Sequence, residues 1–316
     1  MLRPLIVIRH TPKIDFMRWH VFGFAFSILL GCASIAIFLT AGLNYGIDFV
    51  GGTLIEARVT TGPADLAAMR QKLDALHIGE VSLQNFGNDS DVLIRLPEQS
   101  GGDAAQMKAV ELARNALGPN IEYRRVEVVG PTVGKELIRA GAYATILALG
   151  AILVYIWFRF EWQFGLGATI STIHDVVTTI GLFAIFRLEF DLTTLAAILT
   201  IAGYSINDTI VIYDRVREAM RKYRTMSLRD LINLALNETL SRTILTVSTV
   251  ALAVLSLLIF GGEVLRGFSI AMLWGIVIGT YSSLFIAAPL LYYIRPNRRA
   301  VAKAADEPSG GVRRAP

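Results

Sequence analysis

Cysteine, histidine and charge are all scarce in this sequence. The single cysteine, Cys32, excludes a disulfide framework within the chain, and four scattered histidines show no metal-ligand spacing, so we expect no metal site. The absence of a Walker A loop argues against ATP as a fuel, and we expect no cofactor. Charged residues make up only 18% of the chain and hydrophobic residues 53%. This composition excludes an ordinary soluble globular protein and predicts a polytopic membrane protein.

The chain carries an excess of positive charge, with a formal net charge of +4. In a soluble protein this balance would suggest nucleic acid as a partner. Here the basic residues cluster beside apolar segments, as the positive-inside rule describes for cytoplasmic segments of membrane proteins. We therefore expect membrane lipid around the chain and no nucleic acid.

Six apolar segments are long enough to cross a bilayer as helices. The first, 21–41, follows a basic N-terminal segment, 1–20, which places the N-terminus in the cytoplasm. A cleaved signal peptide and a lipoprotein signal ending at Cys32 are alternatives, but the apolar run continues well past Cys32. The other five segments, which make up most of 138–294, are 138–158, 164–186, 192–213, 239–260 and 268–294.

The connections between these segments set the predicted topology. The long basic connection 214–238 is expected in the cytoplasm, together with the C-terminal tail 295–316. The tail is rich in Ala, Pro, Gly and charge and is predicted to be disordered. Both termini are then cytoplasmic, and the segment 42–137 lies outside, in the periplasm.

The segment 42–137 has the pattern of a water-soluble domain. Alternation predicts strands and helical spacing predicts helices in the order strand, helix, strand, strand, helix, strand. This order is typical of a ferredoxin-like α+β domain (βαββαβ) between the first two transmembrane helices. The expected strands are 53–61, 80–86, 91–96 and 121–129, and the expected helices are 63–76 and 103–117.

An acid lies inside the fourth apolar segment, where Asn207 and Asp208 interrupt the hydrophobic run. Inserting an acid at the centre of a membrane helix costs about 2.5 to 3.5 kcal/mol, so such a residue indicates function. The alternative is that Asp208 lies near enough to a helix end to reach water. Asp208 precedes Asp214 by six residues, which places it about 9 Å inside the cytoplasmic end.

Two further ionisable residues lie in the neighbouring segments. Arg242 lies early in the fifth segment, at a depth that Asp208 can share, and Asp175 lies on a small, polar face of the third. An opposite charge favours the ionised carboxyl and burial favours the neutral one, so a pair that opens and closes suits a proton carrier. The alternative is a permanent structural ion pair. We predict a proton relay at Asp208 and Arg242, supported by Asp175 and Asn207.

Small residues mark two more features of the sequence. Gly275, Gly279 and Ser283 recur at intervals of four in the last segment, which predicts a ridge for close helix packing. The glycine-rich segment GLNYGIDFVGGT follows the first transmembrane segment and predicts unusual backbone angles or close approach. It is either a flexible hinge or a specific junction. Its notable residues are Gly46, Asp48, Phe49, Gly51 and Gly52.

These motifs together resemble the SecF branch of the SecD/SecF family of protein-export membrane proteins, which is related to the resistance-nodulation-division transporters. The resemblance covers the chain from the first to the sixth apolar segment. The residues that carry it are GLNYGIDFVGGT, RFEW at 159–162, HD at 174–175, EFDLT at 189–193, GYSINDTIVIYDRVRE, and FGG with GFS at 260–269.

The resemblance implies a multi-pass protein of the bacterial inner membrane that is a translocation subunit and no enzyme. It implies that the chain pairs with SecD, associates with the SecYEG channel and assists the translocating unfolded polypeptide with the proton-motive force, late in secretion. YajC and YidC are further implied partners. It also implies that Asp208 and Arg242 serve proton coupling, with an acid of SecD completing the relay.

Two other functions compete with this one. A proton-driven exporter of small molecules or lipids, as in distant relatives, needs a substrate cavity. A passive scaffold would only organise partner helices through the small-residue ridge. Replacing Asp208 separates these hypotheses, since only a proton relay depends on its carboxyl group.

Overall fold

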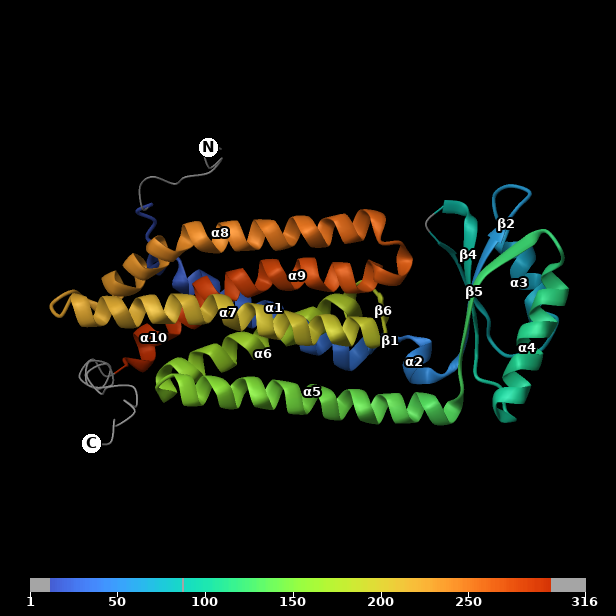
Figure 1. Ribbon diagram of the computed structural model, residues 1–316, viewed down its shortest axis with the longest axis horizontal. Helices are drawn as coiled ribbons and strands as arrows, with labels where there is room; N and C mark the ends of the chain where they lie inside the picture. The colour runs from blue at the N-terminus through green and yellow to red at the C-terminus, as the bar shows by residue number, and fades with distance from the viewer. Residues whose placement is uncertain (1–11, 87, 297–316) are drawn as a thin grey trace, which may run out of the picture.

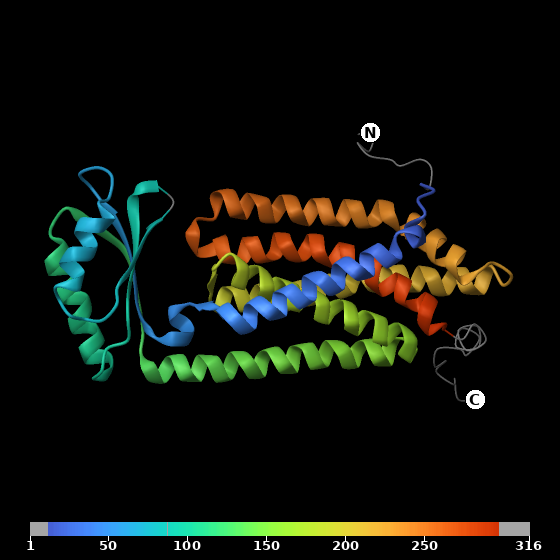
Figure 2. The ribbon, with the colours of Figure 1, turned by 180° about the vertical axis from the view of Figure 1, so that it is seen from behind.

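The computed structural model describes residues 12–86 and 88–296. They form a bundle of long helices with a small domain of strands and helices at one end (Figures 1 and 2). The predicted features of 1–11 and of the tail 297–316 lie outside the described residues.

Six helices in the described part of the chain are long and apolar enough to cross a membrane. The last span contains a π-helical segment, Ser283–Ala287, between α9 and α10. The predicted polytopic helical fold with six transmembrane helices is confirmed. The helices are α1 (His20–Ala41), α5 (Pro131–Arg159), α6 (Trp162–Ile185), α7 (Leu192–Lys222), α8 (Leu228–Phe260), and α9 (Arg266–Ser282) with α10 (Ala288–Ile294).

Three helix boundaries differ from the sequence-based expectation by seven residues or more. The segment 214–238, expected as a loop, is mostly helical, because α7 continues to Lys222 and α8 already begins at Leu228, with only 223–227 between them. With 31 residues, α7 is about 46 Å long, so it exceeds the roughly 30 Å of hydrocarbon and its charged end projects beyond it. In addition, α5 begins at Pro131 and not at 138, since proline suits the first turn of a helix.

The domain at the end of the bundle, called the external domain here after its predicted position, contains a four-stranded antiparallel sheet in the order β3-β4-β2-β5. Its two helices lie on the side of the sheet that faces away from the bundle (Figures 1 and 2). This order confirms the ferredoxin-like arrangement. The elements are β2 (Gly52–Val59), α3 (Leu66–Asp74), β3 (Ser82–Phe86), β4 (Asn88–Leu96), α4 (Gly102–Leu117) and β5 (Ile121–Val129).

Short elements connect the domain to the bundle. After α1, a two-residue strand, β1 (Asn44–Tyr45), pairs in parallel with β6 (Glu189–Phe190), which lies between α6 and α7. A single helical turn, α2 (Ile47–Val50), then leads into β2. On the return path β5 passes through Gly130 directly into α5.

Helix α7 is the central element of the bundle and packs against α5, α6, α8 and α9. Its side chains Ile198, Ile201 and Tyr213 are almost completely buried. By contrast, α1, α5 and α8 expose long rows of apolar side chains, as expected for helices that face lipid or another membrane protein.

Asp91 in the external sheet makes the stability of the domain depend on pH. It lies opposite Arg58 in the register of β2 and β4 and accepts hydrogen bonds from Arg58 Nε at 2.5 Å and Nη2 at 2.7 Å. These bonds hold the pKa of Asp91 below its ordinary value of 3.8. The stabilisation is present at neutral pH and is lost as the pH falls through this lowered pKa.

Asp91→Asn should therefore lower the melting temperature of the domain at neutral pH, and the difference from wild type should shrink below about pH 4. The measurement is thermal unfolding of the purified chain, followed by near-ultraviolet circular dichroism over a pH series. Asp74→Asn, at an exposed position of α3, is the control and should show no such change. A constant difference at all pH values would contradict this role of Asp91.

Candidate functional site

Asp208 lies within α7, where that helix packs on α8. Its side chain is half-buried, and its Oδ1 accepts a hydrogen bond of 2.7 Å from Thr243 Oγ1 on α8. Its Oδ2 is buried and has no hydrogen-bond partner among the described residues. Since α7 continues to Lys222, Asp208 does not lie at a helix end. One carboxylate oxygen is thus bound and the other is left for a proton or a further partner.

Arg242 directly precedes Thr243 on α8 but does not pair with Asp208. No nitrogen–oxygen contact within 4.0 Å joins the two side chains in the described structure, and Arg242 is exposed. The expected ion pair between Asp208 and Arg242 is therefore not formed in this structure. Arg242 lines a polar cavity of about 560 Å³ between the ends of α7 and α8, with Arg159, Val211, Asp214, Arg215, Arg217, Glu218, Arg221, Glu238 and Thr239.

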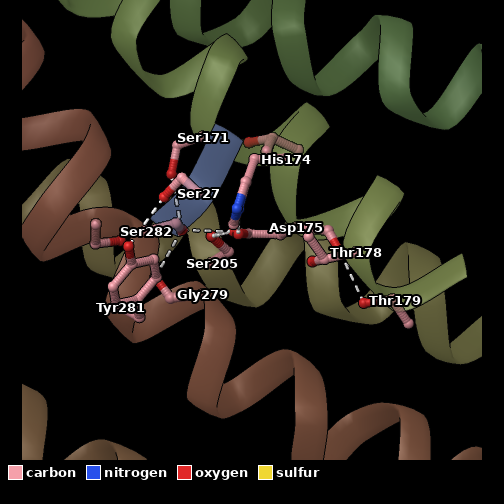
Figure 3. Close-up of polar contacts among 12 residues, drawn as sticks. Ser27, Ser171, His174, Asp175, Thr178, Thr179, Ser205, Gly279, Tyr281 and Ser282 are labelled. Atoms are coloured by element: carbon pink, nitrogen blue, oxygen red, sulfur yellow. Dashed lines mark hydrogen bonds and ion pairs between the residues drawn. The ribbon is translucent and has the colours of Figure 1, made fainter. Parts of the chain in front are cut away.

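Asp175 is a second acid inside the bundle, and it is fully buried on α6. Its Oδ2 accepts hydrogen bonds from Ser205 of α7 at 2.6 Å and from Ser282 of α9 at 2.8 Å. Its Oδ1 lies 3.1 Å from Nδ1 of the neighbouring His174. Figure 3 shows these side chains converging on the carboxyl group from three helices. Asp175 therefore joins α6, α7 and α9 at one point.

A second group of polar contacts, beside that of Asp175, joins α9 to α1. The ring of His174 lies beside that of Tyr281 on α9, with 6.4 Å between the ring centroids. The Tyr281 hydroxyl donates to the Gly23 carbonyl oxygen of α1 at 2.6 Å and lies 3.0 Å from Ser27 Oγ (Figure 3). His174 Nε2 is buried without a hydrogen-bond partner in the described structure. Among the described residues, the hydrogen bonds of Asp175 and those of Tyr281 are therefore two separate groups that meet only through the contact between the His174 and Tyr281 rings.

Sequence reasoning found Asp175 but missed its hydroxyl partners. Ser205 lies three residues before Asp208 on the same helix, and Ser282 directly precedes Ser283 of the predicted ridge. Serines commonly pack between membrane helices without further function, so neither position stood out. The two acids have different neighbours, since Asp175 contacts side chains of α6, α7 and α9 while Asp208 contacts Thr243 of α8.

Asn207 belongs to a polar stripe on the surface of the bundle. It is exposed on α7, as are Thr200 and Gly203, and on α8 the stripe continues with Thr246 and Thr249. Polar residues at membrane depth almost always face protein or water and not lipid. This surface is therefore suited to contact another membrane protein.

The glycine-rich segment after α1 is a packed junction with specific contacts. Asp48 Oδ2 accepts a hydrogen bond of 3.0 Å from the backbone N–H of Leu192, the first residue of α7. Asp191 caps the same helix by accepting from Thr194 N–H at 2.7 Å. Two carboxylates thus bind the N-terminus of α7, where the helix dipole favours negative charge.

Aromatic and glycine residues complete this junction. Phe49 stacks on Phe190, with 5.9 Å between the ring centroids, and Gly46 N–H donates to the Phe190 carbonyl oxygen at 2.8 Å. Gly51 and Gly52 have φ angles of 74° and 113°, and a Cβ at Gly52 would lie 2.4 Å from a backbone oxygen of β4. Only glycine fits this position without strain.

The small-residue ridge packs against α7. A Cβ at Gly275 would lie 2.3 Å from Ile201 Cγ1, and one at Gly279 would lie 3.0 Å from Ser205 Cβ. Ser283 Oγ lies 2.8 Å from Thr209 Oγ1 on α7. The ridge thus lets α9 approach α7 closely enough for Ser282 to reach Asp175.

No group of three or more His, Cys, Asp or Glu side chains in the described part of the chain is arranged to hold a metal ion. The side chains described above carry carboxyl, imidazole, hydroxyl and guanidinium groups. The carboxyl and imidazole groups among them can take up, hold and release protons.

Comparison with known families gives two matches. The family model described as "Protein export membrane protein SecD/SecF, C-terminal" matches residues 109–297, and that of the SecD/SecF GG motif matches residues 36–62. The second match contains the junction around Asp48. The first match contains every residue of the predicted relay.

Curated relatives are similar over most of their length. The protein translocase subunit SecF of Rickettsia bellii (strain OSU 85-389) is 49% identical over 292 residues, which are 91% of this chain and 95% of the relative. The protein translocase subunit SecF of Rickettsia prowazekii (strain Madrid E) is 48% identical, over 91% of this chain and 93% of the relative.

Two solved structures have a similar fold. The crystal structure of SecDF, a translocon-associated membrane protein from Thermus thermophilus, has a TM-score of 0.82 and 35% identity over 93% of this chain. The crystal structure of SecDF in a super-membrane-facing form has a TM-score of 0.69 and 34% identity over 96% of this chain. The present chain spans only 40% and 41% of those two chains.

Gly275→Ala should destabilise the bundle, because the added methyl group meets Ile201 and forces α7 and α9 apart. Overpacking of this kind costs about 1 to 3 kcal/mol. The matched control is Gly203→Ala on α7, where nothing lies within 4 Å of the added Cβ. Thermal unfolding in detergent should show a lower midpoint temperature for Gly275→Ala and an unchanged one for Gly203→Ala. Equal midpoint temperatures for the two variants would contradict the close packing of this ridge.

Proposed function

The chain belongs to the SecD/SecF family of protein-export membrane proteins, and on that premise we propose that it is a SecF subunit that couples the proton-motive force to protein export. The observation that carries this proposal is Asp208, an acid within a membrane helix with one oxygen bound by Thr243 and one free. Ionisable residues inside transmembrane segments mark proton relays in pumps and transporters.

Asp208 and Arg242 form the switch in this proposal. When Arg242 pairs with Asp208, the ionised carboxylate is favoured, and when the pair opens, burial favours the protonated acid. The conformation described here has the pair open. Because Arg242 lines a polar cavity next to the helix ends, its guanidinium has a route to water on the side of the basic residues. Closing and opening the pair would release and take up one proton.

The polar stripe on α7 and α8 is where we place SecD. Exposed Asn207 needs a polar partner at membrane depth, whereas the hydroxyls of Thr200 and Thr246 beside it donate to backbone carbonyl oxygens of their own helices. The matched SecDF chains are more than twice as long as this one, so the part of them that this chain does not match is long enough to correspond to SecD. An acid of SecD would complete the relay beside Asn207. Asp175, held by three neighbouring side chains, keeps α6, α7 and α9 in position.

The remaining assignments follow from charge and from the family. The basic ends of α7 and α8 favour the cytoplasm, which puts both termini there and the external domain in the periplasm of a bacterial inner membrane. The Thermus thermophilus relative is described as translocon-associated, which supports SecYEG as a partner. The translocating unfolded polypeptide is the object on which the domain acts, and YajC and YidC are further partners.

The available energy is sufficient for such work. One elementary charge that crosses 100 mV yields about 2.3 kcal/mol. This amount shifts a two-state equilibrium roughly fiftyfold. A single proton per cycle can therefore bias the position of the external domain.

One observation favours a proton-driven exporter of small molecules or lipids as a second candidate. An apolar groove of about 440 Å³ lies between α2, α5 and α7, lined by Tyr45, Phe49, Val50, Ile138, Gly141, Ala142, Thr145, Ile146, Phe190 and Leu195. It is large enough for a small apolar ligand. Efflux that depends on Asp208 but not on SecD would favour this candidate.

Asp208→Asn should abolish the dependence of export on the proton-motive force, because the amide cannot take up and release the proton. The measurement is export into inverted vesicles with and without an imposed proton gradient. Asp230→Asn, at the exposed start of α8, is the control and should export like wild type.

Co-purification with SecD separates the possible outcomes. Asp208→Asn should still assemble with SecD, and a failure of assembly would favour the scaffold function. Export that keeps its dependence on the gradient in Asp208→Asn would refute the relay at this residue.

A further inference from the structure

The external domain and the bundle are joined by an ion pair in addition to the chain itself. Arg95 Nη2 of β4 contacts Glu189 Oε2 of β6. Arg95 belongs to the external sheet, whereas Glu189 lies in the short connection between α6 and α7. The pair therefore links two bodies that the chain otherwise connects around Gly46 and at Gly130.

The direction of Arg95 follows from the alternation of side chains along β4. Ile94 and Leu96 on either side of it are fully buried under α3 and α4. Successive residues of a strand point to opposite faces, so Arg95 leaves the sheet on the face without helices. That face is turned toward the bundle (Figures 1 and 2).

The pair is partly shielded from water. The side chains of Arg95 and Glu189 are only 20% and 28% exposed. Burial raises the pKa of Glu189, Arg95 opposes this shift, and the nearby Asp191 and Asp48 add to it. Loss of Arg95 would therefore leave a carboxylate that is poorly solvated and surrounded by like charges. A pair in this setting contributes more than a fully exposed one.

Glu189 also lies at the base of the helix that carries the proposed relay. It is two residues before Asp191, which caps α7, and β6 pairs with β1 next to the Asp48 contact to Leu192. The N-terminus of α7 is thus fixed to the same short segment that binds Arg95. A continuous helix transmits displacement along its length as a rigid element.

We propose that the Arg95–Glu189 ion pair transmits movement of α7 to the external domain and holds that domain in a defined orientation. This inference rests on the proposed function, in which protonation of Asp208 displaces α7. Arg95 and Glu189 act as positioning residues and bind no proton in the transport cycle.

The orientation of the domain tests the proposal directly. Two spin labels, on exposed Gln71 of α3 and on Val264 between α8 and α9, report the distance between domain and bundle in a Cys32→Ser background. In Glu189→Gln some molecules should show other label distances, because the domain is released from its wild-type orientation. The ratio of molecules with the wild-type distance to molecules with a released domain should fall roughly tenfold, as expected for loss of one charge-assisted hydrogen bond.

Two further variants serve as controls. Arg58→Gln removes a comparable pair within the same domain, with Asp91, and should keep the wild-type distance. The double variant Arg95→Glu with Glu189→Arg reverses the pair and should restore the wild-type distance. An unchanged distance in Glu189→Gln, or no restoration in the double variant, would overturn the proposal.

Export measured with the same variants separates this inference from the proposed function. Gradient-driven export should fall in Glu189→Gln and recover in the double variant. A released domain with unimpaired gradient-driven export would overturn transmission through this pair. Failure of the proton relay itself would instead appear in Asp208→Asn, whose export would keep its dependence on the gradient.

Discussion

A carboxyl group inside a membrane must be bound by the protein, because hydrocarbon offers it neither water nor hydrogen bonds. The bundle is arranged around this requirement. Ser205 and Ser282 bring α7 and α9 to Asp175 on α6, and Thr243 brings α8 to Asp208. The hydroxyl contacts need close helices, which the small residues of α9 allow. Asp175 is fully enclosed and Asp208 is not, which suits a structural role for the first acid and a role in proton exchange for the second.

Helix α7 connects the proposed relay with the external domain. Its N-terminus is held by Asp48 and Asp191, its interior carries Ser205 and Asp208, and its far end reaches the cavity lined by Arg242. A displacement at Asp208 would therefore reach the junction of the domain through one continuous helix. The glycine-rich segment is the other half of that junction, since Gly52 lets the chain pass close to β4.

The fold was largely predictable from the sequence, whereas the partners of the acids were not. Apolar length alone predicted six spans, and the order of strand and helix patterns predicted the ferredoxin-like domain. The segment 214–238 was expected as a loop because its charges were taken as a sign of a connection, but long helices can project beyond the hydrocarbon. Asp208 stood out because an acid within an apolar run is rare. Thr243, Ser282 and the Arg95–Glu189 pair depend on contacts between distant segments, which periodicity does not reveal.

The central claim is that proton exchange at Asp208 moves the external domain. Single-molecule fluorescence transfer between a dye on the domain and one on the bundle, in vesicles that hold the chain with SecD, measures this most directly. Imposing a proton gradient should change the transfer efficiency in the wild-type chain and leave it unchanged in Asp208→Asn. An equal response of both chains, or no response of the wild type, would contradict the account.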